Sequence, residues 1–292
     1  MSDKRKAFLI CHRGALGDFI LCWPSVILLK KNFPEHVFVG LGRPDYMKLA
    51  IKLGVLDDWF DAESAVMLDF FEAGKVPKEL GNLDKGALWL KDARKTADLL
   101  KMNSGCELTP LDPFPSEKIP VAKFHINQIS MLFKIKDPPE PIDLIPGSYF
   151  PAKNTILIHP GSGSEKKNYS VEFYINTAKF AADHFKNDVN FILGPVEMEK
   201  GIGSLFPVES LLIPENTSDL ADLLGGCKLY IGNDSGVSHL SGFLGTPTIA
   251  LYKDTDPEIW GVVGRKTTCL KNPTEDAALK NLKDFLLSGN IF

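Results

Sequence analysis

Short apolar runs alternate with longer stretches of mixed polarity along the first part of the chain. Residues 7–11 are apolar throughout, which is typical of a strand buried on both faces of a parallel sheet. A glycine-containing turn and a helix over 18–32 are predicted next, followed by a strand over 36–40 and a helix over 43–54. The order strand, helix, strand, helix predicts a doubly wound α/β sheet.

The middle of the chain has a weaker pattern. Residues 66–68 and 87–90 predict strands, whereas 92–102 and 121–135 predict helices. Residues 136–153 hold Pro138, Pro139, Pro141, Pro146 and Pro151, and proline at this density disfavours both helix and central strand. This segment is therefore predicted to be a linker between domains.

The alternation of strands and helices restarts after the predicted linker. Strands are predicted over 155–159, 189–193, 228–231 and 248–252, and helices over 170–186, 197–203, 218–225, 235–244 and 275–287. We therefore expect two domains, residues 1–145 and 146–292, with packing of the closing helix back on the first domain left open.

Composition narrows the class of protein. The 292 residues carry a net charge of −4, from 33 basic and 37 acidic side chains, whereas a general nucleic-acid binder would usually show a basic excess. The five cysteines are scattered and form no C-x-x-C pair, which argues against a disulfide framework or a zinc site and favours the reducing cytoplasm. No apolar run is long enough to span a bilayer, but contact with the cytoplasmic face of an inner membrane stays open.

The first segment with candidate chemistry is Arg13-Gly14-Ala15-Leu16-Gly17-Asp18, which follows the first predicted strand. Its glycines allow the backbone to turn tightly and to approach a ligand. Asp18, at the start of the predicted helix, could be a helix N-cap or a functional carboxylate. The spacing differs from G-x-G-x-x-G, so an NAD-dependent oxidoreductase is a poor match.

Two further segments suit a phosphate group. After the strand over 155–159, the run Ser162-Gly163-Ser164 offers backbone and hydroxyl donors, and Lys166 and Lys167 stand at its far end. Such a loop can hold a diphosphate, and a flexible polar loop is the alternative interpretation.

The other segment is Asp234-Ser235-Gly236, which joins a predicted strand to a helix and is followed by His239. Asp234 and Ser235 are good capping residues, and Gly236 leaves the first helical turn open to an anion. His239 alone could be a core histidine, but neither Lys167 nor Asp234 is expected in a core.

Asp254 and Asp256 are spaced like a metal-binding Asp-x-Asp, although turn capping is the favoured interpretation because Pro257 follows.

Taken together, these segments resemble the ADP-heptose:lipopolysaccharide heptosyltransferase family, glycosyltransferase family nine. The resemblance runs nearly end to end, and the order of the segments makes it specific. It rests on Arg13-Gly14-Ala15-Leu16-Gly17-Asp18, His159-Pro160-Gly161-Ser162, Asp234-Ser235-Gly236 with His239, and Asp256-Pro257.

The resemblance implies a GT-B-like fold, with two Rossmann-like doubly wound domains that face a central cleft. It implies an inverting, metal-independent transfer of a sugar, heptose from ADP-heptose, to a lipopolysaccharide-core or related acceptor that is a saccharide or a lipid-linked saccharide. No cofactor is implied beyond the nucleotide sugar.

The resemblance also assigns roles. Asp18 would be the general base, with Arg13, Gly14, Ala15 and Gly17 in the acceptor-side loop. Lys167, or Lys166 in its place, would bind the phosphates, and Glu197 the nucleoside. Ser162, Gly163, Ser164, Asp234, Ser235, Gly236 and His239 would complete the donor site.

The chain departs from the family pattern at two places. Lys-x-Trp-Pro is common where this chain has Lys167-Asn168-Tyr169-Ser170, and Gly-Pro is common before Thr-Asp-Pro where this chain has Lys253-Asp254. These departures leave open a non-catalytic relative that binds a nucleotide sugar without transferring it.

Overall fold

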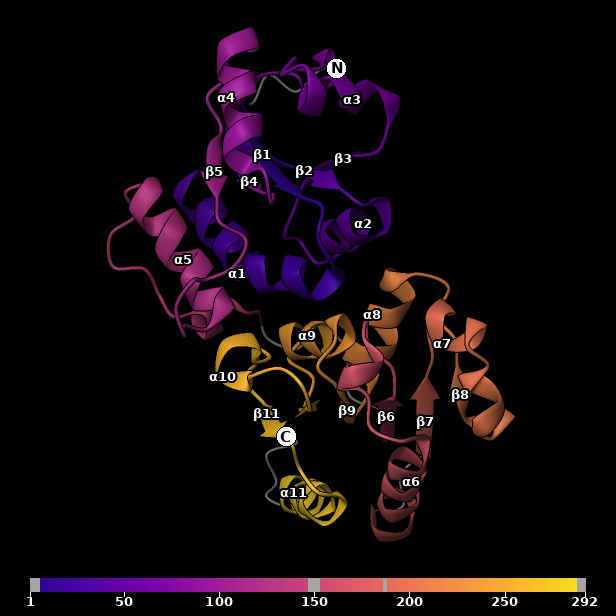
Figure 1. Cartoon of the computed structure of the whole chain (residues 1–292). Helices are drawn as coiled ribbons and strands as arrows, with labels where there is room; N and C mark the ends of the chain where they lie inside the picture. Colours follow the sequence, from indigo (N-terminus) through magenta and orange to yellow (C-terminus); the bar gives the residue numbers. More distant parts are fainter. Residues whose placement is uncertain (1–5, 147–152, 186–187, 288–292) are drawn as a thin grey trace. The chain divides into compact units, whose positions relative to one another are not determined.

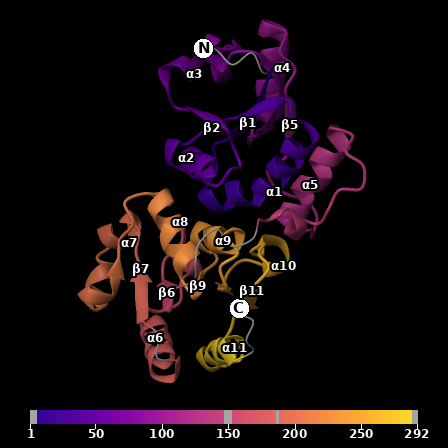
Figure 2. The same cartoon turned by 180° about the vertical axis from the view of Figure 1, so that it is seen from behind.

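The computed structural model describes residues 6–146, 153–185 and 188–287. The chain divides into two compact units, Met1–Leu144 and Ile145–Phe292. Each unit contains one sheet, and all of the strand pairs in both sheets are parallel. Figures 1 and 2 show helices packed around each sheet. The predicted α/β class with two Rossmann-like units is confirmed.

The first sheet has the strand order β3-β2-β1-β4-β5. Its elements are β1 (Lys6–His12), α1 (Leu16–Asn32), β2 (His36–Gly42), α2 (Pro44–Lys52), β3 (Asp58–Asp61), α3 (Ala65–Glu72), η1 (Lys78–Leu80), β4 (Leu83–Trp89), α4 (Ala93–Ser104), β5 (Thr109–Leu111), α5 (Val121–Leu132) and η2 (Pro141–Leu144). The order reverses between β1 and β4, and ligands of doubly wound sheets bind at such a switch point.

The second sheet repeats this arrangement with one more strand, in the order β11-β10-β9-β6-β7-β8. Its elements are β6 (Thr155–His159), η3 (Glu165–Lys167), α6 (Val171–Phe185), β7 (Asp188–Ile192), α7 (Pro195–Glu199), η4 (Ile202–Leu205), η5 (Val208–Ser210), β8 (Leu211–Leu212), α8 (Thr217–Gly226), β9 (Leu229–Asn233), α9 (Gly236–Phe243), β10 (Thr248–Tyr252), α10 (Pro257–Trp260), β11 (Thr267–Lys271) and α11 (Glu275–Leu287). Here the switch point lies between β6 and β9.

The two faces of β1 explain why its sequence is continuously apolar. Leu9 and Cys11 pack in a cluster with α3 and α4, whereas Phe8 contacts the rings of Phe33 and Phe133, which follow α1 and α5. Helices α1 and α5 lie side by side in this unit (Figures 1 and 2). Because helices cover both faces of the sheet, residues that point to either face are apolar, and β1 shows no alternation of polar and apolar residues.

The core of the second unit is built in the same way. Ile156 and Ile158 of β6 belong to one core cluster with Tyr174 of α6 and with Ala278 and Leu282 of α11. The closing helix, for which packing on the first domain was left open, thus contributes its buried residues to the core of the second unit.

Several sequence predictions need correction. Residues 66–68 were expected to be a strand but belong to α3, in which Met67 and Phe70 are buried and Val66 and Leu68 are exposed. The predicted linker also begins too early, since η2 contacts α1 and α5 of the first unit. Its residues 147–152 lie outside the described part of the chain. Strands β3, β5, β8 and β11 were not predicted.

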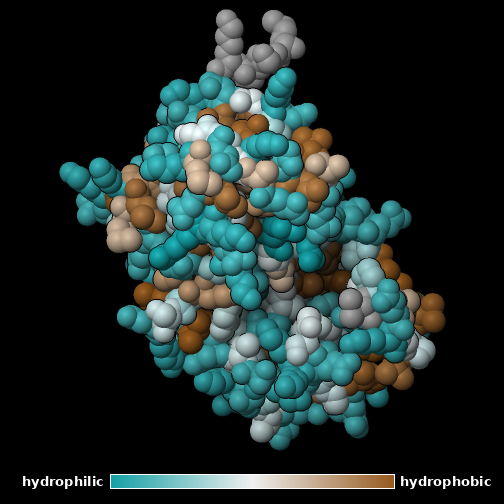
Figure 3. Space-filling model, turned by 45° about the horizontal axis from the view of Figure 1, so that its top comes forward, coloured by the Kyte–Doolittle hydropathy of each residue, from teal (hydrophilic) through white to brown (hydrophobic). Residues whose placement is uncertain are grey.

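Within the described ranges, no helix is both long enough and apolar enough to cross a membrane. Figure 3 shows hydrophilic residues over most of the face in view, with hydrophobic patches between them. The large exposed hydrophobic residues come from both units, with Met102 and Met131 73% exposed and Val208 82% exposed.

Candidate functional site

The candidate site of the first unit lies at the carboxyl end of β1, beside the switch point. His12 ends the strand, and the exposed residues Arg13, Gly14 and Ala15 lead into α1. Ala15 is the N-cap of α1, and Asp18 is the acidic residue of its first turn. The N-cap interpretation of Asp18 is therefore wrong, because the helix begins two residues earlier than predicted. Asp18 is half-buried and lines a pocket.

Gly14 brings two polar side chains close together. A Cβ atom at this position would lie 2.9 Å from Cε1 of His12 and 3.5 Å from Oδ2 of Asp18. The His12 ring is 5% exposed and stacks on Phe19 with a centroid distance of 5.1 Å. Burial lowers the pKa of His12 to about 3, so its imidazole is neutral at pH 7. His12 therefore places no positive charge beside the carboxyl group of Asp18 at neutral pH.

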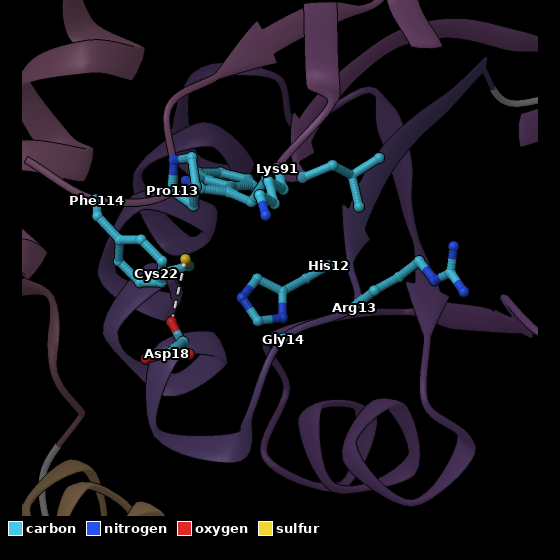
Figure 4. Close-up of a pocket in the computed structure, with 10 residues that line it drawn as sticks. His12, Arg13, Gly14, Asp18, Cys22, Lys91, Pro113 and Phe114 are labelled. Atoms are coloured by element: carbon cyan, nitrogen blue, oxygen red, sulfur yellow. Dashed lines mark hydrogen bonds between the residues drawn. The ribbon is translucent and has the colours of Figure 1, made fainter. Parts of the chain in front are cut away.

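A pocket of about 480 Å³ opens at Asp18. Figure 4 shows Asp18, Cys22 and Phe114 on one side of it and the ring of His12 on the other. The remaining lining residues are Arg13, Gly14, Trp89, Leu90, Lys91 and Pro113. The Trp89 indole, at the end of β4, is held by a 3.1 Å hydrogen bond from Nε1 to Nδ1 of His125. The wall opposite His12 is thus mainly apolar, with one carboxylate at its edge.

A second pocket, of about 430 Å³, shares Arg13, Leu90 and Lys91 with the first. Its charged lining consists of the cations Arg13, Arg43, Lys91 and Lys95 and the anions Glu63 and Asp92. This excess of positive charge is a local basic patch, although the net charge of the whole chain is −4. It can attract an acidic group of a ligand.

The candidate site of the second unit lies at the carboxyl ends of β6, β9 and β10. Three loops meet there: residues 160–170 after β6, 234–235 after β9 and 253–256 after β10. Side chains of each loop contact the other two, so the three form one structure at the switch point of the second sheet.

The central contact of these loops is an ion pair. Nζ of Lys167 donates to Oδ2 of Asp234 at 2.6 Å, and the Thr255 hydroxyl donates to the same oxygen at 2.5 Å. Asp234 is 4% exposed, which corrects the expectation that it would lie outside the core. Lys167 keeps 28% of its side chain exposed, whereas Lys166 is an exposed residue. Of the two lysines proposed to bind phosphate, Lys167 is the one that contacts Asp234.

The surroundings of Asp234 keep it ionised. Burial would raise the pKa of its carboxyl group, but interactions with His239, Lys167 and Thr255 outweigh that effect and lower the pKa to about 2. Nε2 of His239 lies 3.7 Å from Oδ1 of Asp234, so their interaction is electrostatic rather than a short hydrogen bond. The folded-state pKa is depressed, so ionised Asp234 contributes stability above about pH 4 that is lost as the pH falls through about 2.

Two asparagines that were not predicted as site residues fix the loop that carries Lys167. Asn233 is fully buried, and its Nδ2 donates to the carbonyl oxygen of Pro160 at 2.8 Å and to Oδ1 of Asn168 at 3.1 Å. The Ser162 hydroxyl donates to the same Oδ1 at 2.6 Å, and the Tyr174 hydroxyl donates to Oδ1 of Asn233. The position of Asn233 just before Asp234 at a strand end was the available sequence signal.

Helix α9 begins at this junction. Ser235 is its N-cap, and its Oγ accepts a 3.4 Å hydrogen bond from the backbone N–H of Ser238. Gly236 is the first helical residue, so the free N–H groups of the first turn are not covered by a side chain there. The predicted capping role of Ser235 is confirmed. Lys167 and the N-terminus of α9 place positive charge on neighbouring elements, which suits an anion.

Glu197 lies in α7, after β7, and is 7% exposed. Its Oε2 accepts a 2.9 Å hydrogen bond from the Gly194 N–H. A Cβ atom on Gly161 would overlap the Glu197 carboxylate, which explains the glycine at that position. Burial lowers the pKa of the adjacent His159 to about 4, and the charge of Glu197 partly offsets this effect. Glu197 thus reaches the beginning of the loop that carries Lys167.

The Asp-x-Asp segment has a structural role. Oδ1 of Asp256 accepts a hydrogen bond from the Glu258 N–H at the start of α10 and forms a 3.2 Å ion pair with Lys271. The predicted capping is confirmed. In the described parts of the chain, no group of three or more His, Cys, Asp and Glu residues is placed to hold a metal ion.

Comparison with known proteins decides the family. Residues 140–286 match the model of glycosyltransferase family 9 (heptosyltransferase). The chain belongs to glycosyltransferase family 9. A curated relative, lipopolysaccharide heptosyltransferase 1 of Salmonella typhimurium, is 30% identical to it over 79 residues, which are 27% of this chain and 25% of the relative. The match thus spans only a quarter to a third of the length of the curated relatives, with shares of 25% and 34%.

Solved structures of the family share the fold over almost the whole chain. The family 9 glycosyltransferase of Veillonella parvula superimposes with a TM-score of 0.78 at 16% identity, over 99% of both chains. An Escherichia coli heptosyltransferase solved with ADP gives a TM-score of 0.70 at 16% identity, over 97% of this chain and 99% of that one. At such low identity these likenesses show the fold, and function has to be argued from the site.

Proposed function

We propose that this protein is an inverting glycosyltransferase that transfers heptose from ADP-heptose to a saccharide acceptor of the lipopolysaccharide core or a related envelope glycan. The observation that carries the proposal is the Lys167–Asp234 pair beside the N-terminus of α9, at the switch point of the second sheet. Membership of family 9 and a relative solved with ADP support the choice of donor.

The donor half would stabilise the leaving diphosphate. The loop with Ser162, Gly163 and Ser164 and the first turn of α9 supply neutral donors, and Lys167 supplies a positive charge. Such preorganised groups stabilise negative charge that grows in the transition state, and this role needs no resident cofactor. Glu197 would accept hydrogen bonds from the nucleoside, since a buried carboxylate beside a glycine can reach sugar hydroxyls.

The acceptor half would supply the base. In the proposed step, the acceptor oxygen forms a bond to the anomeric carbon while the bond from that carbon to the diphosphate breaks. ADP leaves with the electron pair, and Asp18 takes the hydroxyl proton. The half-buried carboxylate at the edge of an apolar pocket suits this role.

The basic pocket beside Asp18 supports an acidic acceptor. Arg13 and Lys91 line both pockets, so a saccharide at Asp18 could extend a carboxylate or phosphate toward Arg43 and Lys95. A lipid-linked acceptor of this kind would bring the enzyme to the cytoplasmic face of the inner membrane.

Calorimetric titration with ADP, UDP, GDP, CDP and AMP, each with EDTA present, tests the donor half. We expect ADP to bind most tightly and AMP at least about tenfold more weakly, because AMP lacks the second phosphate and the charge-assisted hydrogen bonds that it accepts. EDTA should not change the affinity for ADP. Equal affinity for ADP and AMP would contradict the assignment of the Lys167 loop to a diphosphate.

A further inference from the structure

Lys253, just after β10, makes two contacts with the loop that carries Lys167. Its Nζ donates a 3.0 Å hydrogen bond to the carbonyl oxygen of Asn168 and lies 5.8 Å from the centroid of the Tyr169 ring. An exposed lysine usually moves freely, because its side chain has high rotamer entropy. Here the backbone of one neighbour and the ring of the next both hold the ammonium group.

Asn168, whose backbone oxygen binds Lys253, is also held through its side chain. Asn168 accepts hydrogen bonds on Oδ1 from Ser162 and Asn233, and on its backbone oxygen from Lys253. It directly follows Lys167, whose ammonium group has to stay at the diphosphate position. The β10–α10 loop therefore reaches Lys167 in two ways, through Lys253 on the Asn168 backbone and through Thr255 on the Asp234 carboxylate.

The two departures from the family pattern meet at this contact. Lys253 stands where glycine is common, and Tyr169 stands where tryptophan is common. In the structure the ammonium group of the first lies against the ring of the second.

We infer that Lys253 is a positioning residue of the donor site, which holds the loop of residues 160–169 so that Lys167 meets the diphosphate. The inference rests on the proposed donor site and adds a residue to it. Lys253 acts through Asn168 and Tyr169, so its loss allows the loop to move and weakens diphosphate binding while the three loops still fold.

The test compares Lys253→Met with Lys228→Met. Lys228 lies at the amino end of β9, on the opposite edge of the same sheet, and its Nζ donates to Asn154 at 3.4 Å. Lys253→Met should raise the Kd for ADP about 3- to 10-fold, the usual size of one hydrogen bond with an ordering effect. Lys228→Met should leave it unchanged, and Lys253→Arg should restore most of the affinity.

Hydrogen exchange of the backbone amides of residues 160–169 gives a readout that does not depend on ADP. Lys253→Met should accelerate this exchange, and Lys228→Met should not. An unchanged Kd in Lys253→Met, with wild-type protein that binds ADP, overturns the inference and leaves the proposed function intact. A raised Kd without faster exchange assigns Lys253 to direct charge contact and also overturns it. Failure of the wild-type protein to bind ADP refutes the proposed donor site itself.

Discussion

Replacing Asp18 with asparagine is expected to lower turnover by about 10²–10⁴-fold, the usual size of a general-base contribution. The amide keeps the shape of the carboxylate but cannot accept the proton of the acceptor hydroxyl. The affinity for ADP should change less than about twofold, because the donor groups are on loops of the second sheet. Single-turnover kinetics with saturating donor and acceptor measure the chemical step itself.

Asp45→Asn is the matched control. Asp45 is also a half-buried acidic residue in the first turn of a helix of the same unit, α2, but it does not line the pocket at Asp18. Both substitutions remove a favourable interaction with a helix N-terminus, at a cost of about 0.3–1 kcal/mol. Only Asp18→Asn should lose turnover. Near-normal turnover in Asp18→Asn would return Asp18 to a structural role and leave the proposed mechanism without a base.

Replacing Lys167 with methionine should weaken ADP binding about 10- to 100-fold, as expected for the loss of a charge-assisted contact. The effect has two sources. The ammonium group is removed from the diphosphate, and the buried Asp234 carboxylate loses its closest cation and then repels the anion. Titration of ADP into the variant measures the sum of both effects.

Lys166→Met separates the two adjacent lysines. Lys166 is exposed, so its replacement should have at most a small effect on the affinity, of about twofold. Lys167→Met should also raise the pKa of Asp234, since Lys167 is one of the groups that lower it. A larger loss of affinity in Lys166→Met than in Lys167→Met would assign the phosphate contact to Lys166 and contradict its assignment to Lys167.

Strands buried on both faces were the easiest elements to predict. Each of the strands β1, β6 and β10 contains a continuous apolar run, and the short length of the run between turn signals favours a strand over a buried helix. Helix α3 shows the limit of the argument. Residues 66–68 are all apolar, but only the spacing of Met67 and Phe70 reveals that the buried face is helical.

The missed strands are the edge strands of the two sheets, and three of the four, β3, β5 and β8, have four residues or fewer. β8 has two residues and β5 has three, one of them Pro110, so neither carries a hydrophobic period. Their strand conformation follows from pairing with β7 and β4, which is a tertiary effect.

The site divides in the same way. The start of α9 at Ser235–Gly236 was predictable because N-capping leaves a local signature, whereas the same reasoning misplaced Asp18, which lies inside the first turn of α1. The pairing of Lys167 with Asp234, 67 positions further along the chain, was not predictable, because sequence shows charges but not which of them meet. The roles of Asn168, Asn233 and Lys253 were not predicted, for the same reason. Their roles are hydrogen bonds between loops that the sheet order brings together.

Acceptor-dependent release of ADP from ADP-heptose is the most direct test of the claim that this protein is a glycosyltransferase. Heptose-deficient lipopolysaccharide serves as the acceptor, and the Asp18→Asn variant is measured beside the wild-type protein. We expect ADP release that requires the acceptor, persists in EDTA, yields a heptosylated product by mass spectrometry and falls at least about 100-fold in the variant. Tight binding of ADP-heptose with neither transfer nor hydrolysis across a panel of envelope saccharides would contradict the claim, and would leave a protein that binds a nucleotide sugar without turning it over.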